Sequence, residues 1–352
     1  MDSQFSNILM KKNLVSIVIP CRNEIEYISN LINSIKNSNY PQSFIEILIV
    51  DGMSDDGTRD LLHNNFTSKY NNIKLLDNIK QKTPFAFNLG IKHSQGEFLI
   101  IIGARHVISK NYISEVVKAL KYNNKIGCVG GIVNNVFENN ISKIISLAMC
   151  SPFGVGFSNF RSIKVDSYVD SIGSPAFRKE IFDEIGYFDE RLTRNQDDDF
   201  SFRVIKAGYK ILLKANTSVN YNVRTSLKKL FRQFKQYGYW KVFVNKKHKS
   251  VTTIRQLFPM LFLISIIILL IIRFAFPLAD TILIIELILY ILLSLYFSIR
   301  SLKHEGLGLK ILVHMYVCFI LHVSYGLGYI EGILDFFILN RSPNINNEKL
   351  SR

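Results

Sequence analysis

Cysteine is scarce in this chain of 352 residues. The four cysteines share no spacing typical of a zinc site or a disulfide framework, and they suit a reducing compartment: Cys21, Cys128, Cys150 and Cys318. The first fourteen residues also lack the long apolar core of a secretory signal peptide. These absences argue against a small disulfide-bonded secreted protein, and we expect the first part of the chain to stay in the cytoplasm.

Acidic residues are missing from residues 224–255, which hold ten Lys or Arg residues of a chain with a formal net charge of +15. Because this block adjoins a long apolar run, we expect it to bind anionic lipid headgroups on the cytoplasmic side of a membrane, and not nucleic acid. Residues 226–242 predict an amphipathic helix in the membrane interface, because apolar side chains at helical spacing are followed by aromatic ones: Leu227, Leu230, Phe231, Phe234, Tyr237, Tyr239 and Trp240.

Charge is nearly absent from three stretches of the C-terminal part. Residues 257–272 carry none, and apolar residues continue to position 279 beyond the single Arg273. Residues 281–298 contain one acid, Glu286. The third stretch, 311–340, is longer and holds two histidines and two acids: His314, His322, Glu331 and Asp335. A soluble protein buries one such helix but hardly three in succession, so we predict three transmembrane helices and a polar tail, 341–352, on the far side of the membrane.

The first part of the chain alternates apolar runs with helical patterns. Residues 15–20 and 45–51 are short runs rich in Ile, Leu and Val that end in turn residues, as buried parallel strands do. We expect further strands at 73–76 and 97–102, with a helix over 84–93. This order predicts an α/β fold whose ligand binds beyond the carboxyl ends of the parallel strands.

The ends of the first two strands carry motifs that resemble those of family 2 glycosyltransferases. The first strand runs into a Pro-x-x-Asn-Glu pattern at Pro20, Asn23 and Glu24. The second ends in Asp51 and a Ser-x-Asp-Gly-Thr pattern that contains Asp56. The resemblance implies the fold called GT-A, a Rossmann-like α/β domain that binds a nucleoside-diphosphate sugar.

The resemblance also implies that Asp51 contacts the base of the nucleotide, with Asp56 and the turn of residues 20–24 close to the donor. A structural alternative stays open for both aspartates. Asp51 caps the turn that follows it, and Asp56 caps a helix that begins at Thr58.

The metal-binding element of the family is missing from this chain. In the family the fourth strand ends in an Asp-x-Asp element that holds Mg²⁺ or Mn²⁺ against the donor diphosphate, whereas this sequence has Gly103, Ala104 and Arg105. The resemblance implies a divalent metal, and the loss of both carboxylates puts that metal in doubt. One hypothesis is that the guanidinium of Arg105 and the glycine turn at Gly103 bind the diphosphate directly. The alternative is a site that has lost its metal and its function, in which Arg105 is merely exposed to solvent. We expect the adjacent His106 to have a structural role and not to bind a metal.

Lys82 lies in a stretch that, in the family, leads into the fourth strand near the donor. Its ammonium group is a candidate phosphate contact, and the alternative is an exposed lysine in the turn before Pro84. Asn88 and Gly90, in the helix that follows, are expected to serve packing.

Three adjacent aspartates at 197–199 contain the candidate catalytic base. In the family a Phe-Asp-Glu turn, here residues 188–190, precedes a Glu-Asp pair whose Asp is the general base; the pair in this chain is Gln196 and Asp197. The resemblance therefore assigns the base to Asp197, with Asp198 as the competitor because Gln196 breaks the pair. Inverting transfer needs a carboxylate to take the proton of the acceptor hydroxyl. Aspartates in the first turn of a helix also complement the helix dipole, so a structural role stays open.

Two further segments resemble membrane-bound members of the family. Arg232 lies in a segment that closes over the donor in those members, and it is a candidate diphosphate contact or a lipid contact. Residues 322–336 are similar to the C-terminal region of glycosyltransferases of the succinoglycan-biosynthesis type.

These patterns predict four segments: a GT-A domain at 1–223, a basic interfacial segment at 224–256, three transmembrane helices at 257–340 and a polar tail at 341–352. We expect a multi-pass protein of the cell (inner) membrane whose cytoplasmic domain moves a sugar from a nucleoside-diphosphate sugar, with UDP as the expected nucleotide, to a lipid-linked saccharide acceptor. Two alternatives stay open. One is a polyprenyl-phosphate or processive glycosyltransferase, and the other is a non-catalytic nucleotide-binding membrane protein.

Overall fold

The protein, as described by a computed structural model, forms two compact units. The first combines residues 1–135 with 163–222, and the second combines 136–162 with 223–352. The segment 136–162 thus belongs to the unit of the long apolar helices, whereas the sequence placed it in the first domain. The structure describes residues 11–156, 165–223, 226–251 and 254–343.

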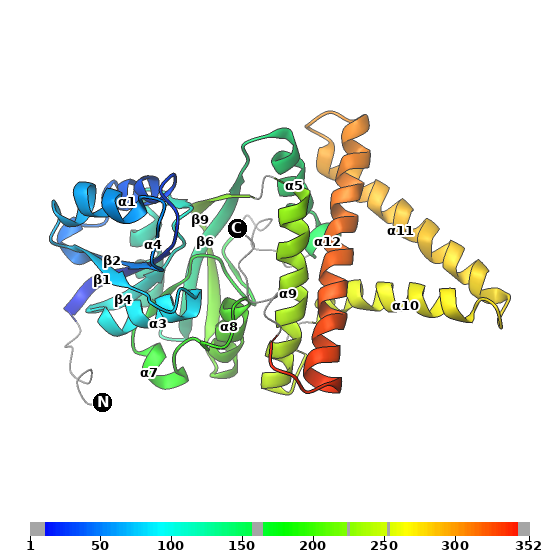
Figure 1. Ribbon diagram of the computed structural model, residues 1–352. Coiled ribbons are helices and arrows are strands. Elements are labelled where there is room, and N and C mark those ends of the chain that lie inside the picture. The colour runs from blue at the N-terminus through cyan, green and yellow to red at the C-terminus, as the bar shows by residue number, and fades with distance from the viewer. Residues whose placement is uncertain (1–10, 157–164, 224–225, 252–253, 344–352) are drawn as a thin grey trace. The chain divides into compact units, whose positions relative to one another are not determined.

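A mixed sheet forms the centre of the first unit (Figure 1). Its strands lie in the order β3-β2-β1-β4-β8-β6-β9-β5, and β7 pairs with β9. The first four strands run parallel, while β8 runs antiparallel to both β4 and β6. The strands are β1 (Lys11–Cys21), β2 (Ile45–Asp51), β3 (Ile73–Asp77), β4 (Gly96–Ile101), β5 (His106–Ile108), β6 (Ile126–Val136), β7 (Ser167–Tyr168), β8 (Ala176–Arg178) and β9 (Lys210–Asn222).

The four strands expected from the apolar runs are confirmed, with shifts at their ends. The run at 45–51 is β2 itself, and every one of its residues is buried. The run at 15–20 is the inner part of the longer β1, whose first residues are exposed lysines. The α/β fold class is therefore confirmed, and the motifs that follow the first two runs lie at strand ends.

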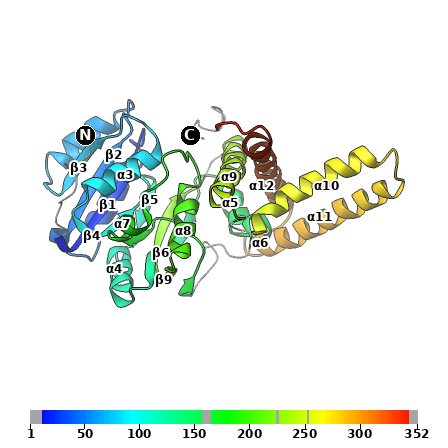
Figure 2. The ribbon, with the colours of Figure 1, turned by 90° about the horizontal axis from the view of Figure 1, so that it is seen from below.

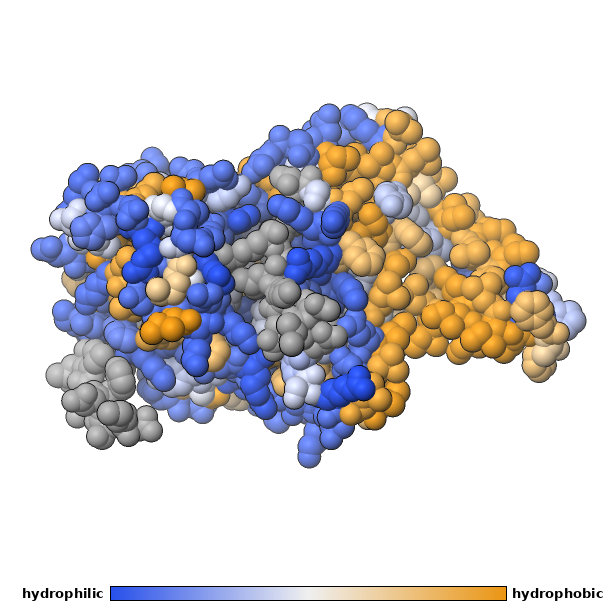
Figure 3. Space-filling model, viewed as in Figure 1, coloured by the Kyte–Doolittle hydropathy of each residue, from blue (hydrophilic) through white to orange (hydrophobic). Residues whose placement is uncertain are grey.

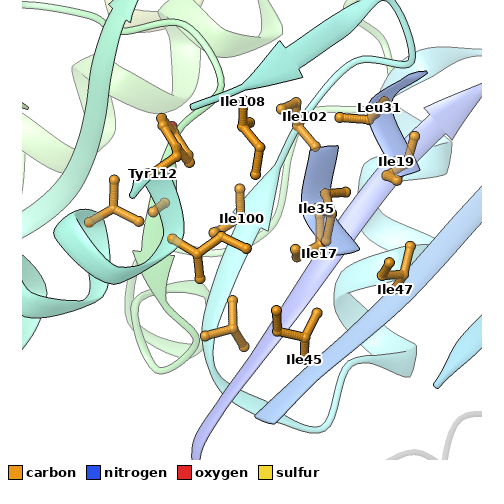
Figure 4. Packing of buried hydrophobic residues seen from close by; sticks show 14 of the residues in the cluster. Ile17, Ile19, Leu31, Ile35, Ile45, Ile47, Ile100, Ile102, Ile108 and Tyr112 are labelled. Carbon is orange, nitrogen blue, oxygen red and sulfur yellow. The ribbon is translucent and has the colours of Figure 1, made fainter. Parts of the chain in front are cut away.

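Helices cover both faces of the parallel strands. On one face Ile17, Ile47 and their neighbours pack against Leu31 and Ile35 of α1 and against Tyr112 of α4 (Figure 4). On the other face α3 lies so close to β1 that a Cβ added at Gly90 would come within 2.3 Å of Val18. The helices of this unit are α1 (Ile28–Lys36), η1 (Gln42–Phe44), α2 (Thr58–Leu62), η2 (His63–Thr67), α3 (Thr83–His93), α4 (Tyr112–Tyr122), α7 (Ile181–Ile185) and α8 (Gln196–Lys206).

The second unit is helical. Its long helices α9 and α12 lie side by side, and α10 and α11 project away from them as a hairpin in both views (Figures 1 and 2). The helices of this unit are α5 (Asn140–Cys150), α6 (Pro152–Val155), α9 (Leu227–His248), η3 (Ile254–Leu257), α10 (Phe258–Ile272), α11 (Leu278–Leu302), α12 (Leu309–Ile333) and η4 (Leu334–Ile338). Three helical segments among the described residues are long and apolar enough to cross a membrane: Ile254–Ile272, Leu278–Leu302 and Leu309–Ile338. Apolar residues dominate the visible surface of this part (Figure 3).

The amphipathic helix predicted at 226–242 is present as α9, but its apolar side is covered by protein and not by lipid. Leu230 and Phe234 are buried in a cluster with residues of α5 and α12. Tyr239 and Trp240 are both fully buried, so their rings contact protein and not lipid headgroups. The apolar periodicity was correctly read as helical, but the surface that covers it is protein.

Candidate active site

The loops that follow β1 and β2 are joined by hydrogen bonds. The backbone amide of Asn23 donates to Ser54 Oγ at 2.8 Å, and its side-chain amide donates to Asp55 at 2.8 Å. The Glu24 amide donates to Thr58 Oγ1 at 3.0 Å. Asn23 has a φ of +54°, a conformation that Asn adopts more easily than most residues. The two sequence motifs therefore form one structural element, and this explains why they occur together.

Asp51 supports this element from a buried position. Its carboxylate is completely buried and accepts hydrogen bonds from the Ser54 amide (2.9 Å), the Ser54 hydroxyl (2.5 Å) and Arg59 Nη1 (2.8 Å). Arg59 also contacts Asp77 at the end of β3 at 2.8 Å. These contacts fit the alternative of a turn-capping residue, and the contact of Asp51 with a nucleotide base stays a prediction.

Asp56 also has a structural role. Its carboxylate accepts from the Thr58 amide at 3.0 Å and the Thr58 hydroxyl at 2.5 Å, immediately before α2, and from the Ile25 amide at 3.3 Å. Burial by itself raises the pKa of Asp56, but these hydrogen bonds outweigh burial and lower the pKa below its ordinary value. Asp56 thus joins the start of α2 to the loop after β1.

Arg105 is the cationic group at the end of β4, and two neighbours hold it. Its Nε lies 2.7 Å from the carboxylate of the nearly buried Glu24, and its guanidinium lies 4.9 Å from the centre of the Tyr27 ring. Among the residues that the structure describes, no hydrogen bond or ion pair engages the two terminal nitrogens of Arg105. About a third of the side chain is exposed. A guanidinium fixed at Nε, with its terminal fork open, is suited to bind phosphate oxygens.

The residues at the end of β4 do not fit a divalent metal of the kind the family binds. Gly103 supplies no side chain, its carbonyl oxygen lies 2.9 Å from His106 Nδ1, and Arg105 brings a positive charge. No group of three or more His, Cys, Asp or Glu side chains that could hold a metal occurs in the described ranges. His106 also pairs with Tyr221 across β5 and β9, so it has the structural position expected of it.

Lys82 lies directly before α3, at the end of the loop that follows β3. Its backbone carbonyl accepts from Asn78 Nδ2 at 3.0 Å, and its side chain is partly exposed. Asn88, in the middle of α3, is buried and donates to the Phe188 carbonyl and to Glu190, both at 2.9 Å. The packing role expected of Asn88 is therefore observed, and it fixes the Phe-Asp-Glu turn against α3.

The strand directions place the start of α8 at the same edge of the sheet as these loops. β6 is parallel to β4, because each is antiparallel to β8. Gly127 and Gly131 of β6 lie against Tyr209 and Thr217, so β9 runs in the direction of β6. β9 therefore begins at the edge of the sheet opposite to the one where β1, β2 and β4 end. α8 ends four residues before β9 begins, so its last turn lies near that opposite edge. Its first turn then lies toward the edge where β1, β2 and β4 end.

The three aspartates of this turn have different surroundings. Asp199 is completely buried and pairs with Arg203 at 3.1 Å, and Arg203 also donates to the carbonyl oxygens of Ile185 and Gly186. Asp198 is partly buried and accepts from Asn195 Nδ2 at 3.3 Å. Asp197 is exposed, and one of its oxygens accepts from the Asp198 amide at 3.0 Å. Of the three carboxylates, that of Asp197 is the most accessible to an acceptor that approaches from outside the protein.

Two buried hydroxyl groups near this edge were not identified from the sequence. Ser174 lies just before β8, beside the end of β4, with a φ of +52°. Thr193 lies three residues before α8. Neither hydroxyl has a hydrogen-bond partner in the part of the chain that the structure describes. Serine and threonine are too common for their sequence positions alone to have singled them out.

Arg232, the last of the predicted donor contacts, belongs to the second unit. It is exposed on the surface of α9. Its contact with the diphosphate stays a prediction.

Comparisons with known proteins identify the family of the chain. The model of "Glycosyl transferase family 2" matches residues 16–186. The chain is 33% identical, over 92% of its length and 99% of the other protein's, to a dolichyl N-acetyl-alpha-D-glucosaminyl phosphate 3-beta-D-2,3-diacetamido-2,3-dideoxy-beta-D-glucuronosyltransferase of Methanococcus voltae. It is 29% identical to succinoglycan biosynthesis protein ExoA of Rhizobium meliloti, over 69% of this chain and 74% of that one. The crystal structure of GalNAc-T7 with UDP, GalNAc and Mn²⁺ is similar with a TM-score of 0.49 and 16% identity, over 60% of this chain and 44% of that one.

The chain therefore belongs to glycosyl transferase family 2, and its first unit has the GT-A fold. It is a glycosyltransferase of glycan biosynthesis with apolar helices that associate it with a membrane.

Proposed function

We propose that this protein is an inverting glycosyltransferase that moves a sugar from a nucleoside-diphosphate sugar, with UDP as the nucleotide, to a lipid-linked saccharide. The relative from Methanococcus voltae is named for transfer onto a dolichyl phosphate-linked N-acetylglucosamine, and the two chains align over nearly their full lengths. A lipid-linked acceptor remains in the bilayer, so an enzyme that uses it gains from helices that hold the active site at the membrane surface.

In this proposal the donor diphosphate binds at the shared edge of the sheet, against Arg105. The negative charge on the diphosphate grows as the bond from the sugar C1 to the phosphate oxygen breaks, and the two terminal nitrogens of Arg105 stabilise it. Glu24 and Tyr27 hold the guanidinium in place before the donor arrives, so little reorganisation is needed. Lys82 and Arg232 are the further candidate cations for the phosphates, and the backbone at Gly103 lets the donor approach closely.

The proposed base is Asp197. Its carboxylate takes the proton of the acceptor hydroxyl while that oxygen forms a bond to C1 from the side opposite the diphosphate. The bond between C1 and the phosphate oxygen breaks with its electron pair going to the nucleoside diphosphate, and the configuration at C1 is inverted. Asp198 remains the second candidate, whereas Asp199 is occupied by its ion pair with Arg203.

The proposed location is the cytoplasmic face of the cell membrane, in a multi-pass protein. The exposed lysines and arginines of α9, which include Lys228, Lys229 and Arg232, are expected to contact anionic headgroups there. The segments 224–256 and 257–340 would thus serve the domain at 1–223 by keeping it beside its acceptor.

The observation that carries this proposal is the open guanidinium of Arg105 on the same edge of the sheet as the exposed Asp197. Membranes that contain the protein should be incubated with radiolabelled nucleotide sugars and lipid-linked saccharides, with EDTA and with Mg²⁺ or Mn²⁺. We expect one labelled lipid-linked product, extended by a single sugar, that also forms in EDTA. The proposal is wrong if label is found on polyprenyl phosphate alone or in a polymer, or if no transfer exceeds that of membranes without the protein.

A further inference from the structure

The hairpin of α10 and α11 exposes apolar side chains on every side. Successive residues of a helix point about 100° apart. In α11 the neighbours Ile291, Leu292 and Leu293 are all exposed, and in α10 the same holds for Ile267 and Ile268. A surface that is apolar all round is unsuited to water and is the surface of a helix surrounded by lipid.

The helix α12 differs, because its exposed apolar side chains form one stripe. The large ones recur every three, four or eight residues, which keeps them on one side of a helix: Leu309, Leu312, Tyr316, Phe319 and Leu327. The opposite side packs against α5 and α9, where Val317, Cys318 and Leu321 are buried. Lipid can therefore contact α12 along one side only.

The covered side of α12 is bound to α9 over the C-terminal half of α12 and the residues that follow it. Lys235 pairs with Glu331 at 2.7 Å, Tyr239 donates to Asp335 at 2.8 Å, and Lys246 reaches Asn340 at 2.8 Å. The partner numbers rise together, so the two helices run in the same direction. At the crossing point, a Cβ added at Gly238 of α9 would lie 2.1 Å from the Tyr325 carbonyl oxygen. Wherever α12 lies in the membrane, α9 must lie beside it.

The charges of α9 are incompatible with a path across the bilayer. Arg232 and Lys246 are both exposed, and 14 residues of helix separate them, about 21 Å. This is shorter than the hydrocarbon core of about 30 Å. Between them lies the ion pair of Lys235 and Glu331, whose side chains are 37% and 28% exposed. A transmembrane α12 would carry this pair and at least one terminal charge of α9 into the hydrocarbon.

The hairpin has the charge spacing that crossing requires. From Arg255 to Arg273 the chain advances by 18 residues, about 27 Å of helix, and α11 has 25 residues, about 37 Å. At the tip, Arg273 and Asp280 form an exposed ion pair at 3.1 Å. The acid inside the hairpin, Glu286, accepts a hydrogen bond from Ser265 at 2.5 Å. The next charges are Arg255 before α10 and Arg300 near the end of α11.

From these observations we infer that the chain crosses the membrane twice and not three times. The α10–α11 hairpin spans the bilayer with its tip at the far surface. The pair of α9 and α12 lies along the near surface, with the apolar stripe of α12 in the lipid and the charges of α9 at the headgroups. In both ribbon views the hairpin projects sideways from the α9–α12 pair, as this arrangement requires (Figures 1 and 2). The residues that follow α12 then lie on the same side of the membrane as those that precede α10.

Three single cysteine variants test this arrangement: Ala275→Cys at the hairpin tip, His304→Cys between α11 and α12, and Ser342→Cys after α12. All three positions are exposed, and the unchanged chain supplies the background of its four native cysteines. Intact cells that express each full-length variant are treated with a membrane-impermeant maleimide, with and without permeabilisation. We expect Ala275→Cys to react in intact cells, and both His304→Cys and Ser342→Cys to react only after permeabilisation.

Whether α12 crosses the membrane is decided by comparing the labelling of the cysteines at positions 304 and 342. If they react from opposite sides, α12 crosses the membrane and the inference is wrong. It is also wrong if all three positions react from one side, because then the hairpin does not cross. If 304 and 342 both react in intact cells and 275 does not, two crossings are upheld and the proposed cytoplasmic location is refuted, so the two ideas fail separately.

Discussion

At the scale of single residues, Arg105 is the point where this chain departs from the metal-dependent pattern. Glu24, part of the sequence motif after β1, is the residue that pairs with it. A carboxylate next to a guanidinium keeps the arginine oriented but also reduces its net charge. The proposed binding of a diphosphate therefore depends on the fork geometry of the terminal nitrogens as much as on charge.

Arg105→Ala should raise KM for the nucleotide sugar by about 10- to 100-fold, because a hydrogen bond to a charged group contributes about 1.5–3 kcal/mol. Arg105→Lys should fall between the alanine variant and the parent, since a lysine keeps the charge and loses the fork. Lys118→Ala, at an exposed position of α4, is the matched control. The measurement is the initial rate at increasing concentrations of nucleotide sugar, with a parent enzyme that is active. The role of Arg105 is refuted if Arg105→Ala and Lys118→Ala have the same KM.

Asp197→Asn should lower kcat by about 10²- to 10⁴-fold, the usual contribution of a general base. Donor affinity should stay within about twofold, because the amide keeps the shape of the side chain. Asp198→Asn is the comparison, and the larger loss of kcat identifies the base. Asp199→Asn is a separate control that should reduce thermal stability, since it leaves Arg203 buried without its ion pair. If the Asp197→Asn enzyme has the kcat of the parent, Asp197 is not the general base.

Asp56 gives a prediction about pH. Its folded pKa lies below the value of an unfolded chain, so its stabilising effect is complete above the unfolded pKa of about 3.9 and is lost as the pH falls through the folded value. Asp56→Ala should lower the free energy of unfolding by about 0.5–2 kcal/mol at pH 7, the usual cost of a lost helix cap. Thermal unfolding in detergent should show this difference shrinking below pH 4. A difference that is constant down to pH 3 would contradict the role of the charge.

The residues of the site differ in how far the sequence could predict them. The motifs correctly located Glu24, Asp51 and Asp56 at strand ends, because the apolar runs and turn residues that mark these ends are local. The burial of Asp51 was not predictable, since it results from Arg59, an arginine that local patterns do not distinguish from a solvated one. Pairs such as Glu24 with Arg105, 81 residues apart, form only when the sheet brings strand ends together.

At the scale of elements, glycines let α9 and α12 pack with their backbones in close contact. A Cβ added at Gly328 of α12 would come within 1.9 Å of the Lys235 carbonyl oxygen, and one at Gly332 within 2.8 Å of that of Tyr239. The close approach also places Asn245 within 2.8 Å of the Tyr329 hydroxyl. The sequence around these glycines therefore encodes a helix pair, in addition to an apolar segment.

Gly238→Ala should separate α9 from α12, because the backbone carbonyl it meets cannot move without bending α12. Overpacking of this kind costs about 1–3 kcal/mol, and we expect a lower midpoint of thermal unfolding in detergent. Lys229→Ala, at an exposed position of the same helix, should leave the midpoint unchanged. Equal midpoints for Gly238→Ala and the parent would mean that the two helices are not packed as described.

For the elements, as for the residues, the sequence predicts local structure but not which distant parts of the chain are in contact. The strands were predictable because all residues of β2 are buried, and all but Glu46 and Asp51 are apolar. The periodicity of α9 was also correct, but an apolar stripe does not reveal whether protein or lipid covers it. The segment 136–162 was assigned to the wrong part of the chain because its partner, α12, lies more than 150 residues further on.

At the scale of the whole molecule, the apolar surface and the basic charge would act together. In the inferred arrangement the hairpin would supply a permanent anchor, and the lysines and arginines of α9 would orient the near surface toward anionic lipid. An acceptor with a lipid tail and a sugar head would meet the enzyme in the same plane. The number of crossings therefore determines which parts of the chain can border this acceptor, and it can be tested without knowing the sugar.

Lysine substitutions at two similarly exposed apolar positions measure the depth of the two helices. Ile288 of α11 and Phe319 of α12 are 50% and 43% exposed, and each lies near the middle of its helix. Ile288→Lys should cost about 2.5–3.5 kcal/mol of apparent insertion free energy, because the charge enters the centre of the bilayer. Phe319→Lys should cost far less, since an interfacial lysine reaches the headgroups. Both effects are measured as the amount of each variant that stays in the membrane after alkaline extraction, relative to the parent. Equal losses would place α12 as deep as α11 and contradict its position at the surface.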